Sequence, residues 1–144
     1  MEEAYFHISR YFGHIASKYN AFREKRVAQF GVGRSDLPIL HQLALHNRPM
    51  HLGEIAMRTM SDRALIGRAA KHLAELGYIA FQDNPFHKTK KDVVLTEAGR
   101  QVANEVLQAT LDWEKGAESL LTPAERESLY AMLDKVYQAS SNLE

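Results

Sequence analysis

Residues 52–79 read LGEIAMRTMSDRALIGRAAKHLAELGYI, and the apolar spacing in this stretch decides the fold. Apolar residues recur at intervals of three and four on both sides of Ser61 and Asp62, as on the buried face of a helix. Serine and aspartate cap helix starts, and glycine often follows a helix end. The stretch therefore predicts two helices, one over 52–59 and one that opens at Ser61 or Asp62 and stops at Gly77.

A hairpin is predicted directly after these helices. Residues 78–82 and 92–96 are rich in β-formers and flank the polar, proline-containing segment 83–91, which we expect to be the connecting loop. Two helices joined by a tight turn and followed by a hairpin are the layout of a winged helix-turn-helix. In that layout the second helix enters the major groove of DNA. The expected fold class is mainly α with a small β-hairpin wing.

Longer helices are predicted on either side of this module. The first is expected from Ala4 to about Gln29, with an apolar stripe of Tyr5, Ile8, Phe12, Ile15, Tyr19 and Phe22. Others are expected over 36–46, from a capping Thr96 to about Ala117 with Trp113 on its apolar side, and from Thr122 onward with Leu129, Met132, Leu133 and Val136 in one stripe. The terminal stripes exceed what a small winged domain can cover alone, which predicts pairing with a second copy.

Composition narrows the class of protein. The chain has 144 residues, no cysteine and a formal net charge of zero, which excludes disulfides, thiolate metal sites and thiol redox sensing. No apolar run is long enough for a membrane span, and no export signal follows the acidic start, so the cytoplasm is the expected location. The charge is segregated: residues 58–91 carry a net +4, and residues 105–144 carry a net −5. The middle of the chain is therefore the candidate DNA face.

The second helix of the motif supplies most of that face. Its inward stripe is predicted to be Leu65, Ile66, Ala69, Ala70, Leu73 and Leu76. The remaining helix positions and the wing lysines form the predicted DNA-binding set: Arg63, Ala64, Gly67, Arg68, Lys71, His72, Lys88, Lys90 and Lys91. Small residues let a helix approach base edges, and arginine pairs with guanine or clamps a phosphate.

Four blocks of sequence resemble the MarR family of bacterial regulators. They are Leu52-Gly53-Glu54-Ile55-Ala56, then Asp62-Arg63-Ala64-Leu65-Ile66-Gly67-Arg68, then Leu73-Ala74-Glu75-Leu76-Gly77-Tyr78-Ile79, and Leu95-Thr96-Glu97-Ala98-Gly99. The resemblance implies one MarR-type domain over 1–144, with a winged helix-turn-helix module at about 36–96 and dimerisation helices at 4–30 and 97–141. It also implies a homodimeric repressor that binds a palindromic operator and is modulated by a small ligand.

Two departures from the family pattern bear on DNA recognition. The family usually has serine or threonine near positions where this chain has Ala64, Leu65 and Gly67, so base readout is expected to depend on Arg63 and Arg68. The usual wing pattern, Asp-Arg-Arg or Asp-x-Arg, is replaced by residues 87–91, HKTKK. Lysines there predict phosphate contacts in place of an arginine in the minor groove.

Other function classes stay open at this stage. Seven histidines suggest a metal-responsive regulator, although their spacing fits a helical metal site poorly. Neutral overall charge and the missing hydroxyls suit a winged-helix protein-interaction module with little DNA affinity. No catalytic arrangement is recognisable, so we expect no enzyme, no cofactor and no metal ligands. The sequence names no residue that binds the small ligand.

Overall fold

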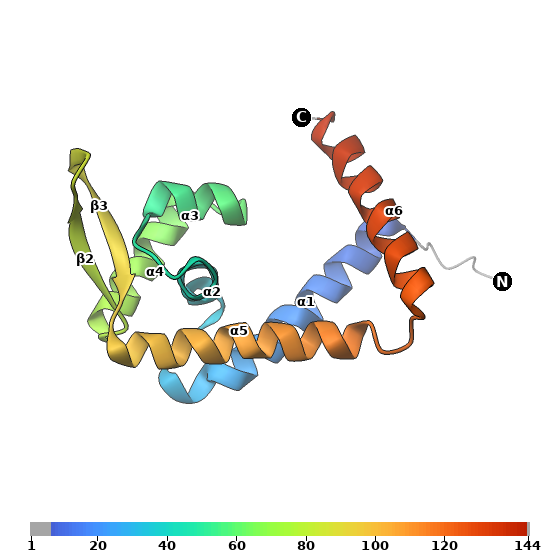
Figure 1. The fold of residues 1–144 in the computed structure, drawn as a ribbon, viewed down its shortest axis with the longest axis horizontal. Coiled ribbons are helices and arrows are strands. Elements are labelled where there is room, and N and C mark those ends of the chain that lie inside the picture. Colours follow the sequence, from blue (N-terminus) through green and yellow to red (C-terminus); the bar gives the residue numbers. More distant parts are fainter. Residues whose placement is uncertain (1–6, 144) are drawn as a thin grey trace. The chain divides into compact units, whose positions relative to one another are not determined.

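The computed structural model describes residues 7–143. They form two compact units, and the boundary along the chain lies between Leu111 and Asp112. The helices, in chain order, are α1 (Ile8–Val27), α2 (Leu37–His46), α3 (Leu52–Thr59), α4 (Arg63–Glu75), α5 (Glu97–Ala117) and α6 (Pro123–Ser141) (Figure 1). The strands are β1 (Met50–His51), β2 (Ile79–Asn84) and β3 (His87–Leu95), and two short 3-10 turns lie at Ala28–Phe30 and Arg34–Asp36. The predicted fold class, mainly helical with a small β wing, is confirmed.

One hydrophobic core holds the first unit together. Fully buried side chains come from the helices α1 to α5 and from β3: Val27, Leu37, Ile39, Leu40, Leu43, Ile55, Ile66, Leu73, Val93, Val102 and Val106. Burial of each such side chain stabilises the fold by about 1.5–3 kcal/mol. The core fixes α4 against α2 and α3, so the opposite face of α4 is turned to solvent.

The ends of α3 and α4 lie where the sequence predicts them. Asp62 caps α4, because its Oδ1 accepts a hydrogen bond from the Leu65 N–H at 3.0 Å. Gly77 follows α4 with φ +80°, and the N–H groups of Gly77 and Tyr78 bond the carbonyls of Ala74 and Leu73. This is a Schellman motif, for which glycine is the favoured residue.

The sheet differs from the predicted hairpin in two ways. Strand β1 was not predicted; it pairs antiparallel with β3, giving the order β1-β3-β2. The predicted loop 83–91 is also wrong, because β2 continues to Asn84 and β3 begins at His87, so only Pro85 and Phe86 lie in the turn. A polar composition does not prevent pairing in a two-stranded ribbon whose faces are both exposed.

Two side chains of α4 that were predicted to face inward are partly exposed. Leu65 and Leu76 keep 37% and 38% of their surface, at the edges of the buried stripe of α4. The stripe of α1 is exposed at Ile8, Phe12, Ile15 and Phe22. The predicted start of this helix at Ala4, with Tyr5, lies outside the described residues, and the described helix begins at Ile8.

A tight joint links the wing to the start of α5. Thr96 Oγ1 donates to the Gly77 carbonyl at 2.6 Å and accepts from the Gly99 N–H at 3.0 Å, so it caps α5 as predicted. The Thr96 N–H bonds the Tyr78 carbonyl at 3.0 Å. A Cβ at Gly99 would lie 1.7 Å from that carbonyl oxygen, so only glycine fits there.

The second unit contains the end of α5 and all of α6. Thr122 and Glu125 form the predicted capping box, and Pro123 is the first helical residue. Leu129 and Met132 of the predicted α6 stripe are exposed, and Leu133 and Val136 are half-buried. Within residues 7–143, no helix has the length and apolar character to cross a membrane.

Candidate nucleic-acid interface

The turn between α3 and α4 is closed by its own hydrogen bonds. Met60 takes the left-handed conformation (φ 52°) at the end of α3, and the Ser61 N–H bonds the Ala56 carbonyl at 2.9 Å. Thr59 Oγ1 donates to the Ile55 carbonyl at 2.7 Å and lies 2.9 Å from Ser61 Oγ. These bonds set the angle between the two helices before any ligand is present.

The solvent face of α4 presents the residues that the sequence assigns to DNA. Arg63, Ala64, Arg68, Lys71 and His72 are exposed, and Gly67 is half-buried. A Cβ added at Gly67 would meet no atom within 4 Å, so packing inside the protein does not require glycine there. The middle of this face therefore carries small side chains, and cations lie around them. Small side chains let a helix approach the floor of a groove.

The cations of this face lack carboxylate partners. Within residues 7–143, no ion pair is formed by Arg63, Arg68, Lys71 or the wing lysines Lys88, Lys90 and Lys91. Four arginines elsewhere are paired with carboxylates: Arg34 with Glu24, Arg48 and Arg58 with Glu54, and Arg126 with Glu118. Unpaired exposed cations on one surface create the field that attracts phosphates.

His72 differs from the other residues of the predicted set, because its ring is already bound. Its Nδ1 lies 3.0 and 3.1 Å from the two oxygens of Asp36, a buried carboxylate that also accepts from the Gly33 N–H at 2.9 Å. The bond ties α4 to the turn before α2. The structure thus gives His72 a positioning contact that the sequence did not predict.

The wing lysines lie on an irregular part of the hairpin. Asp83 pairs with Lys91 and Asn84 pairs with His87, so residues 88–90 bulge out of β3 opposite a single step of β2. Lys88 and Lys90 are both in this bulge and both exposed. Bulges commonly re-aim side chains at the rim of a sheet, and here the bulge carries two cations.

An open groove connects the wing with the helix-turn-helix. It is lined by residues of α3, the turn and β3: His51, Gly53, Glu54, Ala56, Met57, Met60, Ser61, Arg63 and Lys90. The Arg63 guanidinium lies over Gly53, since a Cβ there would be 3.0 Å from its Nη2. Arg63 and Lys90 therefore share one concave surface, although they are far apart in the sequence.

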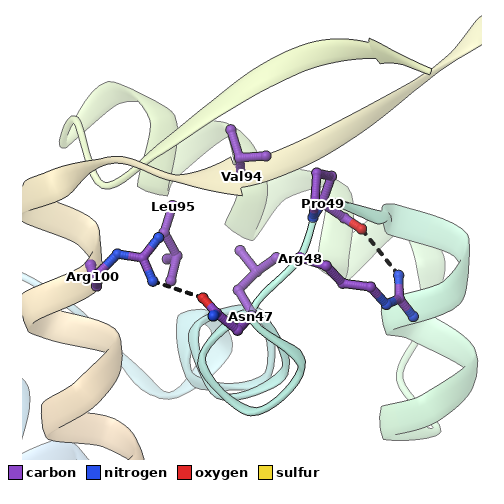
Figure 2. Close-up of a pocket in the computed structure, with 7 residues that line it drawn as sticks. Asn47, Arg48, Pro49, Val94, Leu95 and Arg100 are labelled. Atoms are coloured by element: carbon purple, nitrogen blue, oxygen red, sulfur yellow. Dashed lines mark hydrogen bonds between the residues drawn. The ribbon is translucent and has the colours of Figure 1, made fainter. Parts of the chain in front are cut away.

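A smaller cavity of about 130 Å³ lies behind this surface, between the end of α2, β3 and the start of α5 (Figure 2). Arg100 Nη1 donates to Asn47 Oδ1 at 2.9 Å, and Arg48 Nη1 donates to the Pro49 carbonyl at 3.0 Å (Figure 2). Arg48 also binds Glu54. Because both arginines are already hydrogen-bonded within the protein, we interpret this cavity as a structural contact between α2 and the sheet.

Glu54 is shared by two arginines. It accepts from Arg48 Nη1 at 3.1 Å and from Arg58 Nε at 2.9 Å. The hydrogen bond from Arg48, followed by that from Arg58 and their charges, lowers the pKa of Glu54 to about 2. The carboxylate is thus shared by two arginines beside the groove and offsets one of their two positive charges, whereas the cations of α4 and the wing have no such partner among the described residues.

The histidines do not form a metal centre in the part of the chain that the structure describes. No three histidine, aspartate or glutamate side chains come together as a ligand set among residues 7–143. His51 instead caps α3 by accepting from the Gly53 N–H at 3.0 Å. His41 lies 3.3 Å from Arg23, and burial followed by that positive charge lowers its pKa.

Comparisons with known proteins agree with this geometry. A family model described as "MarR family" matches residues 30–88. The comparison with curated proteins found no match.

Solved structures match over almost the whole chain. A transcriptional regulator SlyA is 24% identical over 94% of each chain, with a TM-score of 0.84. A MarR family protein of Listeria monocytogenes, complexed with a 26mer DNA, is 22% identical over 94% of this chain and 90% of its own (TM-score 0.84). S. aureus MepR, in a DNA complex, is 18% identical over 93% and 98% (TM-score 0.84).

These matches cover both the module that carries the unpaired cations and the long helices beside it. The resemblance seen in the four sequence blocks is thereby confirmed: residues 30–88 match the MarR family, and the chain has the winged helix fold of MarR-type structures.

Proposed function

We propose that this chain is a MarR-family transcriptional regulator that binds duplex DNA as a homodimer, with α4 in the major groove and the wing on the neighbouring backbone. The observation that carries the proposal is the set of unpaired cations on α4 and β3. No carboxylate among the described residues pairs with them, whereas Arg34, Arg48, Arg58 and Arg126 on other surfaces are each paired with a glutamate. DNA phosphates are the chemical partner that such a surface favours.

Exposed apolar side chains support the homodimer. Ile8, Phe12 and Ile15 of α1 are exposed in the first unit. In the second unit, Leu129, Met132 and Tyr137 of α6 are exposed. Apolar stripes on long helices are covered most simply by a second copy of the same chain, which would place two α4 helices on two half-sites of a palindrome.

A role as a repressor, acting in the cytoplasm and controlled by a small ligand, completes the proposal. A polar cluster at α1, α2 and α5 supports the ligand. Arg23 there is only 7% exposed, its Nε has no hydrogen-bond partner among the described residues, and His41 and Thr110 lie beside it. Its Nη atoms bond Asn20 and His41, but no carboxylate among the described residues pairs with it, and a buried cation without an anionic partner favours a small organic anion. Thermal melting with a panel of organic anions, and with matched organic cations as the control, would test this. An anion that binds should raise the melting temperature, and no rise with any anion would contradict the proposal.

DNA binding is tested by in vitro selection of duplexes, followed by anisotropy titrations of a selected duplex and a random duplex at 50 and 200 mM salt. We expect a palindrome of two half-sites and affinity that falls steeply with salt, by roughly 10³-fold or more for about six phosphate contacts. Binding too weak to measure at 50 mM salt would favour the protein-interaction module instead. Adding Zn²⁺ or Ni²⁺ to metal-stripped protein tests the metal-responsive alternative, which predicts a change in this affinity.

A further inference from the structure

The tip of the wing carries an aromatic ring in solvent. The turn between β2 and β3 is Asn84-Pro85-Phe86-His87, and Phe86 is 88% exposed. This is the largest exposed fraction of any aromatic side chain among residues 7–143. The ring is almost entirely in solvent and does not belong to the described core.

The turn that presents the ring is held in one conformation. Asn84 Oδ1 accepts from the Phe86 N–H at 2.8 Å, and Asn84 Nδ2 donates to Asp92 Oδ1 at 3.1 Å. Asp92 is itself 8% exposed, and proline fixes the backbone φ before Phe86. A preorganised turn loses little entropy when its tip residue makes a contact.

Lysines follow the ring along β3. Lys88, Lys90 and Lys91 follow within five residues on β3, are exposed and have no carboxylate partner among the described residues. An apolar tip flanked by unpaired lysines matches a polyanion with an apolar interior. The minor groove of DNA has this character, with phosphates along both edges and base steps at its floor, where phenylalanine can act as a wedge.

We propose that Phe86 is a specificity-determining contact of the wing: its ring enters the minor groove next to the major groove that holds α4 and presses against a base step there. This inference rests on the proposed function. It assigns sequence preference to a residue that carries no charge. Flexible pyrimidine–purine steps would be favoured, because unstacking costs least there.

The salt dependence of binding distinguishes the contact of the uncharged Phe86 from those of the lysines. Phe86→Ala should weaken binding of the selected duplex about tenfold, the amount expected for losing part of a buried phenylalanine. The loss should be the same at every salt concentration, since no counterion is released by an uncharged ring. Phe86→Leu should retain most of the affinity, because leucine is also an apolar wedge. Phe81→Ala, which changes an exposed phenylalanine of the same hairpin away from the tip, is the matched control and should keep wild-type affinity.

A change in the DNA locates the contact. Replacing adenine by 2,6-diaminopurine at the base pairs next to each half-site adds an amino group in the minor groove and leaves the major-groove edge unaltered. We expect this duplex to bind the wild-type protein about tenfold more weakly, and to bind Phe86→Ala as well as the unmodified duplex does. Melting temperatures of the variants check that each is folded.

The outcomes distinguish the two proposals. If the wild-type protein binds no duplex, the proposed function fails, and the wedge fails with it. If the wild-type protein binds but Phe86→Ala has the same affinity and the same response to diaminopurine, only the wedge is overturned. The exposed ring would then be available to a protein partner.

Discussion

Arg68 is the side chain on α4 whose loss should be most informative. It is exposed at the middle of the helix, where Gly67 and Ala64 allow close approach to a groove. Arg68→Ala should cost about 1–3 kcal/mol in binding of the selected duplex and relax the preference at one base pair. Anisotropy titrations against a panel of single-base variants would measure both effects.

The control for Arg68→Ala is Arg126→Ala, which removes a cation that is paired with Glu118 on the acidic part of the chain. It should leave DNA affinity unchanged. Equal losses from both variants would mean that binding responds to overall charge and that Arg68 has no particular role.

Glu54 should make folding stability depend on pH in the acid range. Its pKa is lowered to about 2 in the folded protein by Arg48 and Arg58, against an ordinary value of 4.5. A depressed carboxyl pKa stabilises the fold above pH 4.5, and that contribution is lost as the pH falls to about 2. Glu54→Gln should therefore be less stable than wild type at pH 7, with a gap that narrows between pH 4.5 and 2. Urea unfolding at pH 7, 4 and 3 would measure the gap, and a constant gap would contradict the prediction.

At the scale of elements, the wing and α4 should contribute different kinds of binding energy. Lys88→Ala with Lys90→Ala removes the two cations of the bulge, so affinity should fall about equally for selected and random duplexes. The slope of log affinity against log salt should become shallower by about 2. Titrations of both duplexes over a salt series would test this. A loss confined to the selected duplex would show that these lysines read bases.

The joint at the start of α5 leaves no space for a side chain at Gly99. Gly99→Ala forces the methyl group against the Tyr78 carbonyl and should lower the free energy of unfolding by about 1–3 kcal/mol. Gly116→Ala in the same helix is the control, because a Cβ there meets nothing within 4 Å; it should be neutral or stabilise by up to about 1 kcal/mol. Denaturant unfolding compares the two variants, and equal stabilities would contradict the steric conflict at Gly99.

The elements were predicted best where the backbone alone dictates them. Asp62, Gly77, Thr96 and the Thr122 capping box all lie where their local chemistry predicts. The strand pairing of 83–91 and of β1 could not be predicted in this way, because it depends on partners distant in the sequence. The predicted burial of Leu65 was wrong for the same reason. Helical spacing identifies the apolar stripe, but the packing of neighbouring elements decides how much of its width is covered.

The candidate site was predictable in composition and not in its contacts. Arg63, Arg68, Lys71 and the lysines were identified from charge on one helical face, and their role in DNA binding stays a prediction. The link from His72 to Asp36 spans 36 residues, so no local pattern signals it. Phe86 was missed because it lies in the segment 83–91, which was predicted to be a long polar loop, and only the strand pairing places it in the two-residue turn at the tip.

At the scale of the whole molecule, oligomeric state and DNA binding should be linked. Leu129→Lys with Met132→Lys places two charges on the exposed apolar side chains of α6. It should weaken dimerisation about 100-fold or more without unfolding the chain, because neither residue belongs to the described core. Operator affinity should fall with it, since the two half-sites are then bound independently.

Light scattering after size-exclusion chromatography would measure the mass, and anisotropy would measure the affinity of the same variant. Glu127→Lys, an exposed charge change on the same helix, serves as the control and should remain dimeric. A double variant that stays dimeric would show that another surface pairs the two copies.

The bonds among Thr96, Gly77, Tyr78 and Gly99 also have a mechanical meaning. There is no space for a Cβ at Gly99, and two hydrogen bonds cross the junction, so the first turn of α5 and the segment that ends α4 form a stiff connection. A torque on that turn of α5 would be passed to α4 with little lost in bending. Helix α4 would then rotate as a rigid body, and its displacement would increase with distance from this connection toward Arg63.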